Sequence, residues 1–196
     1  MTAGRPRQFD YDEALDKAMH VFWQKGFEGT SMPDLTDAMG MNRPSIYSSF
    51  GNKEELYRKA LERYSERSFA IFKDKLSAPK LRDAIEGLLC GAAQQFSCGE
   101  KMPKGCMAVQ GGLVGSDDAD GACEQNTAQR EAMMKLLQDR CKQGVSDGEL
   151  PPGTDTKAMA RYISTIINGM AVQSAGGVPG KELKAVAQMA LSIFPA

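Results

Sequence analysis

The chain has 196 residues, 42% of them hydrophobic and 25% charged, which is typical of one folded domain or two small ones. It contains no run of about 18 apolar residues, so we expect no membrane span, and its N-terminal stretch lacks the apolar centre of a secretory signal. Its net charge is −1, and positions 1–76 hold 12 basic and 12 acidic residues, so overall charge does not favour nucleic-acid binding.

Helical periodicity extends along almost the whole chain and strand patterns are nearly absent, so we expect an all-α fold. Asp10 is a candidate N-cap for the first helix, and Gly26 ends it. About nine helices are expected, the others at residues 31–40, 42–50, 52–76, 81–96, 105–115, 122–143, 156–175 and 180–194.

The second and third helices are short, and each begins at a capping residue. Ser31 forms a capping box with Asp34, and Asn42 is followed by Pro44 in the first turn, where the missing N–H does no harm. The two caps are 11 residues apart, with a turn at Gly40 between them. This spacing is typical of a helix-turn-helix motif.

The stretch "GMNRPSIYSSFGNK", residues 40–53, carries two cations and no acid. A helix-turn-helix places the start of its second helix against base edges in the major groove of DNA. We expect Arg43 to read a base, since arginine can bind guanine through two hydrogen bonds. The predicted DNA-contacting residues are Arg5, Arg7, Thr30, Ser31, Asn42, Arg43, Pro44, Ser45, Tyr47, Ser48 and Lys53. The alternative is a helical hairpin with a polar exposed face.

The segment "GRPR", residues 4–7, precedes the first helix and contains Arg5 and Arg7. Arginines on such an arm can enter the minor groove of DNA, as in homeodomains. A solvated tail is the alternative interpretation.

Residues 14–61, "ALDKAMHVFWQKGFEGTSMPDLTDAMGMNRPSIYSSFGNKEELYRKAL", resemble the DNA-binding domain of the TetR/AcrR family of transcriptional regulators. Residues 168–191 resemble the C-terminal end of one branch of that family, whereas residues 77–155 match only in helical layout. The resemblance implies a homodimeric repressor of operator DNA that a small molecule or a chemical modification releases. It also implies a helix-turn-helix domain at 1–52 and an effector-binding and dimerisation domain at 53–196.

The later helices carry the predicted effector and dimerisation residues. Methionine lines adaptable apolar pockets, although it also fills ordinary cores. The expected lining of a pocket for a small apolar effector is Phe96, Cys106, Met107, Met133, Met134, Leu137, Met159 and Ile163. The resemblance places the dimer interface on the last two helices, and the residues expected there are Ile163, Ile166, Ile167, Met170, Ala187 and Leu191.

Cys106 stands at the start of the predicted sixth helix, two residues from Lys104. Both features favour the thiolate, so Cys106 is a candidate sensor of oxidants or electrophiles, with Cys98 as the rival. An unreactive, buried cysteine is the commoner case. The five cysteines form no CxxC pair, which disfavours a disulfide framework and a structural zinc site and favours the reducing cytoplasm.

Other classes of protein fit the sequence less well. The chain has one histidine, His20, and lacks the GxSxG, HExxH and phosphate-loop motifs, so we do not expect an enzyme, a metal or a cofactor. A helical dimeric scaffold that does not bind DNA is the remaining alternative. It would not need Arg43 and Lys53 to be free of neighbouring acids.

Overall fold

The computed structural model describes the backbone of residues 10–97, 103–111 and 120–194, and their side chains except at 111 and 120–126. Within these ranges the only regular elements are helices, which confirms the predicted all-α fold, and none has the length and apolar character of a membrane span. The helices are α1 (Tyr11–Lys25), α2 (Met32–Met39), α3 (Arg43–Phe50), α4 (Lys53–Leu76), α5 (Leu81–Ser97), α6 (Met107–Gly111), α7 (Asp120–Ser146), α8 (Thr156–Ala175) and α9 (Gly180–Leu191).

Local hydrogen bonds fix where α2 and α3 begin. The Ser31 side chain accepts the N–H of Asp34, whose carboxylate accepts the N–H of Ser31 at 2.9 Å, which is the expected capping box. The Asn42 side chain accepts the N–H of Ser45 at 2.9 Å. Gly40 separates the two helices with a φ of 65°, a left-handed conformation that favours glycine. The helix-turn-helix therefore follows from residues close together in sequence.

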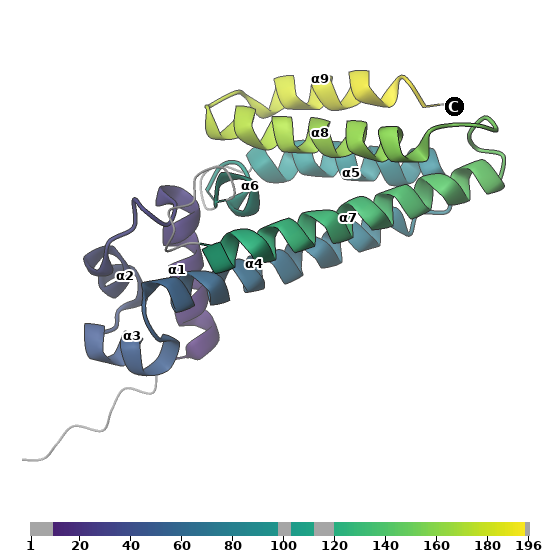
Figure 1. Ribbon diagram of the computed structural model, residues 1–196. Coiled ribbons are helices and arrows are strands. Elements are labelled where there is room, and N and C mark those ends of the chain that lie inside the picture. Colours follow the sequence, from purple (N-terminus) through teal and green to yellow (C-terminus); the bar gives the residue numbers. More distant parts are fainter. Residues whose placement is uncertain (1–9, 98–102, 112–119, 195–196) are drawn as a thin grey trace, which may run out of the picture.

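The N-terminal head is formed by α1, α2, α3 and the first half of α4 (Figure 1). It has a hydrophobic core of its own. Phe22 of α1 packs edge-to-face on Tyr57 of α4, with 5.1 Å between the ring centroids. Buried side chains of α4 as far as Tyr64 belong to this core. The core of the head thus extends past residue 52 into the first half of α4.

Two arginines of α4 tie this helix to α1. Arg63 donates to Asp16 at 2.5 Å and to Asp12 at 2.7 Å, and Arg67 donates to Asp16 at 3.0 Å. Burial disfavours the charged carboxyl of Asp16, but the hydrogen bonds from the two arginines outweigh it and hold its pKa below the ordinary value. These ion pairs join α1 to α4 within the head.

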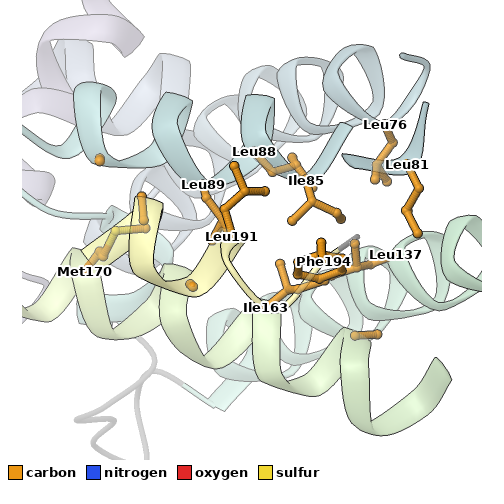
Figure 2. Packing of buried hydrophobic residues seen from close by; sticks show 14 of the residues in the cluster. Leu76, Leu81, Ile85, Leu88, Leu89, Leu137, Ile163, Met170, Leu191 and Phe194 are labelled. Carbon is orange, nitrogen blue, oxygen red and sulfur yellow. The ribbon is translucent and has the colours of Figure 1, made fainter. Parts of the chain in front are cut away.

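The C-terminal body contains the second half of α4 together with α5, α7, α8 and α9. In Figure 1, α7 runs alongside α4, and α5, α8 and α9 stack against each other beside this pair. Figure 2 shows Ile85, Leu88 and Leu89 of α5 in the core that they share with α8, α9 and the C-terminal residues. This core holds the body together by burial of apolar surface.

The apolar stripe on α8, which we expected at a dimer interface, faces this core instead. Ile163 is 0% exposed, and Met170, Ala187 and Leu191 are also buried within the subunit. These four side chains are covered by their own subunit and cannot contact a partner, which corrects their place in the expected interface. Ile166 and Ile167, the other residues expected there, are half-buried at the edge of the core.

Candidate functional site

One face of α3 is exposed and polar, and the other anchors the helix in the head. Ile46 and Phe50 are buried, whereas Arg43, Tyr47 and Ser48 are exposed. Arg43 donates to the Tyr47 hydroxyl at 3.1 Å, and its guanidinium carbon lies 5.5 Å from the centre of the tyrosine ring. The guanidinium is thus held at the surface by the residue one turn later.

The other residues expected to contact DNA near α3 differ in exposure, and some of them contact neighbouring residues. Pro44 is exposed in the first turn, Ser45 is half-buried, and Ser48 donates to the Ser45 carbonyl at 3.0 Å. Lys53 begins α4, and its ammonium lies 4.4 Å from the ring centre of Phe27. No acid lies in the first turn of α3, so the start of this helix presents N–H groups and a cation to an anion.

Two residues expected to contact DNA have hydrogen-bond partners within the subunit. Thr30 is 1% exposed, and its hydroxyl donates to the Gly26 carbonyl at 2.6 Å, so its side chain stabilises the turn before α2 and does not reach the surface. Ser31 is exposed, but its hydroxyl donates to Asp34 at 2.7 Å. Arg5 and Arg7 lie outside the described residues.

The body contains a cavity of about 510 Å³, lined by α4, α5, α7 and α8 and by residues at α6. This volume lies in the range of small-molecule sites. Five of the residues expected in an effector pocket line it: Phe96, Cys106, Met133, Met134 and Leu137.

The other three expected pocket residues lie elsewhere. Met107 is buried in the head core, and Met159 and Ile163 belong to the body core. The sequence marked them as apolar helix positions, and a position of that kind gives no sign of whether it faces a cavity or a packed core. Ile167, which we expected at the dimer interface, lines the cavity instead.

Tyr64 connects this cavity to the head. Its hydroxyl donates to the Cys106 Sγ atom at 3.1 Å, and its ring packs edge-to-face on Trp23 of α1 with 4.9 Å between the centroids. Burial, followed by the neighbouring Cys106, raises the pKa of Tyr64 well above the ordinary value, so Tyr64 stays a neutral donor. Sequence reasoning missed Tyr64, because one aromatic residue on a long helix carries no distinguishing pattern.

The cysteines differ in their surroundings. Burial raises the pKa of Cys141 to about 11, and burial with the nearby Glu86 raises the pKa of Cys90, so both remain thiols at neutral pH. Cys106 is half-buried and lines the cavity. Cys98 lies outside the described residues. Among the residues whose side chains are described, no group of three or more His, Cys, Asp or Glu could hold a metal.

A second apolar surface covers the side of α8 and α9 that points away from the body core. We call it the outer face, and it consists of the exposed residues Tyr162, Val172, Val186, Met189 and Ile193. Met189 is 77% exposed and Ile193 is 54% exposed. The apolar positions Val186, Met189 and Ile193, in α9 and just after it, follow 3/4 spacing and can be recognised in the sequence. The prediction relied instead on the more regular apolar stripe of α8.

Comparisons with known proteins agree with this architecture. The family described as "Bacterial regulatory proteins, tetR family" matches residues 14–60, and "Tetracyclin repressor-like, C-terminal domain" matches residues 79–176. The transcriptional repressor ComR of Escherichia coli K12 is 34% identical over 195 residues, which cover 98% of this chain and 92% of ComR. The repressor BdcR of the same strain is 27% identical over 191 residues, covering 95% of this chain and 90% of BdcR.

Among solved structures, a cysteine variant of the TetR family regulator CifR, in complex with 26-bp double-strand operator DNA, superimposes with a TM-score of 0.90. It is 36% identical, and the match covers 98% of this chain and all of that one. The same family is indicated by the two family matches, by the likeness to ComR and by this superposition. The chain belongs to the TetR family of transcriptional regulators.

Proposed function

We propose that this protein is a cytoplasmic repressor that binds operator DNA through α3 and is released from it when the body cavity is occupied. The observation that carries the proposal is the exposed, acid-free face of α3, on which Tyr47 holds the Arg43 guanidinium. The operator complex of CifR and the repressor role of ComR support it. A non-DNA-binding scaffold would have no use for this face.

Release would act through the contact between cavity and head. A molecule that displaces Tyr64 would change the packing of Tyr64 on Trp23 of α1. The hydrogen bond between Arg63 of α4 and Asp16 of α1 would then transmit a shift of α4 to the head. Packed cores shift between discrete arrangements, so a small displacement in the cavity becomes a rotation of the head. Two recognition helices must stay about 34–36 Å apart, or a multiple, to enter successive major grooves, and such a rotation spoils both contacts.

We assign dimerisation to the outer face of α8 and α9 in place of the stripe expected from the sequence. Its apolar side chains are exposed in the single subunit, and Gly169 on α8 has no atom within 4 Å of where a Cβ would stand, which permits close approach of a partner. An isologous two-fold contact through this face would give the pair of heads that a palindromic operator requires.

Replacing Arg43 by alanine is expected to weaken operator binding by about 1–3 kcal/mol and to relax the preference at one base pair, because a base contact is lost. Replacing Lys53 is the matched comparison: loss of a phosphate contact should weaken all sequences alike and flatten the salt dependence. Both are measured by titration of labelled operator and of a scrambled duplex at several salt concentrations. Wild-type affinity in both variants would contradict the assignment of α3 as the DNA-reading helix.

A second candidate for the release signal is chemical modification of Cys106. This thiol lines the cavity and accepts the hydrogen bond of Tyr64, so a change at sulfur directly alters the contact between cavity and head. The CifR structures in complex with operator carry substituted cysteines, which supports the idea that cysteines matter in a similar protein. In the reaction with hydrogen peroxide, the thiolate sulfur attacks one peroxide oxygen and the O–O bond breaks. The products are a sulfenic acid and hydroxide, which takes a proton from solvent to become water.

If Cys106 is the sensor, treatment with hydrogen peroxide should release the wild-type protein from operator DNA and leave Cys106→Ser bound. Serine keeps a hydroxyl that can accept from Tyr64 but cannot be oxidised in this way. The measurement is operator affinity before and after treatment, with reduction by dithiothreitol as a reversal control. An equal loss of operator affinity in both proteins, or a loss in neither, would exclude Cys106 as the sensor. A reversible ligand would then remain as the release signal.

A further inference from the structure

The cavity has two chemically different ends. Because α4 and α5 are joined by a short turn and run antiparallel, Tyr64 and Ser68 on α4 lie at the same end as Gln95 on α5. Gln129 of α7 is at this end too, since its amide donates to the Ser65 carbonyl at 2.8 Å. The polar side chains are therefore concentrated next to the head.

The rest of the cavity is mainly apolar. It is lined by Ile71 and Phe72 of α4, Leu88 of α5 and Leu137 of α7. Among the cavity-lining residues of α4, Lys75 lies furthest from the head. From Tyr64 to Lys75 is 11 residues, or about 16 Å along the helix. The shape suits an elongated molecule with one polar end.

Charge at the polar end is of one sign. Arg130 of α7, the residue after Gln129, lines the cavity there, and among the described residues no Asp or Glu lines it. Arg130 donates to the Thr127 hydroxyl at 3.1 Å. A guanidinium has five N–H donors in a planar fork, so this one contact does not exhaust its capacity. A mainly apolar cavity that is lined by Arg130 and, at its other end, by Lys75, and by no carboxylate of the described residues, favours an anion over a cation.

We propose that the effector is a hydrophobic monocarboxylate, with its carboxylate at Arg130 and its hydrocarbon body between Ile71, Phe72, Leu88 and Leu137. The Arg130 guanidinium matches one carboxylate, and the apolar side chains between it and Lys75 match a hydrocarbon chain. The carboxylate then lies beside the Tyr64 hydroxyl and the Cys106 thiol, where it disturbs the hydrogen bond between them. This inference rests on the proposed function, because it names the ligand class of the same cavity.

The test compares three probes of equal chain length, used below their micelle concentrations: decanoate, decanol and decylamine. Binding to the full-length protein without DNA is measured by thermal unfolding and by the fluorescence of Trp23, the only tryptophan, which packs on Tyr64 at the cavity wall. We expect decanoate to bind at least about tenfold more tightly than the other two. Equal binding of decanol, or no binding of decanoate at millimolar concentration, overturns the proposal.

Three variants locate the carboxylate. Arg130→Gln should weaken decanoate binding about tenfold and leave decanol unchanged, whereas Lys135→Gln removes the same charge from an exposed position of α7 outside the cavity and should have no effect. Lys75→Gln tests the opposite end of the cavity, and a loss of decanoate affinity in this variant and not in Arg130→Gln overturns the placement. A separate operator titration with decanoate distinguishes the two proposals, since binding without release refutes the proposed release mechanism and retains the ligand class.

Discussion

Replacing Met189 and Ile193 together by glutamate is expected to give a folded monomer that no longer holds operator DNA. Both side chains lie on the outer face and are mainly exposed in the single subunit, so charge there costs the subunit itself little. At a two-fold interface each glutamate would face apolar surface of the partner, and a charge buried without a partner is strongly unfavourable. The subunits should then separate at micromolar concentration.

Loss of the dimer should lower operator affinity by a factor of about 100 or more, because each head then binds its half-site alone. Sedimentation gives the oligomeric state, circular dichroism confirms that the helices remain, and operator titration gives the affinity. Lys157→Glu, at an exposed position near the start of α8, is the matched control and should remain dimeric. A double variant that still sediments as a dimer would show that the outer face is not the interface.

Gly91→Leu is expected to produce a repressor that binds operator normally and does not respond to ligand. Gly91 lines the cavity from α5, and no atom lies within 4 Å of the position that a Cβ would occupy. A leucine there extends into the space that the ligand needs. Removing a glycine from the interior of a helix also stabilises the apo protein by about 1 kcal/mol.

Gly91→Ala separates these two effects, since alanine gives the same gain in helix propensity but adds a single methyl group. We expect both variants to unfold at a higher temperature than the wild type, and only the leucine variant to lose decanoate binding, by about 100-fold. Thermal unfolding and Trp23 fluorescence provide the measurements. Full decanoate binding by Gly91→Leu would mean that the ligand occupies another place.

The helix-turn-helix could be predicted from the sequence because the interactions that define it are local. Ser31 and Asn42 cap helices through side chains that bond to backbone groups three residues away, and Gly40 supplies the left-handed turn. The exposure of Arg43 and the burial of Ile46 follow from the helical period. These features need no information about distant parts of the chain.

Positions that depend on distant partners were less predictable. Thr30 is a hydroxyl residue beside a helix cap in the sequence, and only the fold shows its side chain covered and bonded to Gly26. The cavity contact between Tyr64 and Cys106 joins residues 42 apart in the sequence. No local pattern encodes such a pair, because it forms only when α4 and α6 pack together.

The sequence by itself determined that α8 and α9 are amphipathic and that the protein is helical, because periodicity records which positions are covered. Only the tertiary structure decided what covers them. Ile163 and Met170 are buried by their own subunit, whereas Met189 is left exposed on the outer face. Apolar side chains gain a similar free energy whether they are buried by their own subunit or by another chain. Hydrophobic patterning alone therefore cannot distinguish a core from an interface.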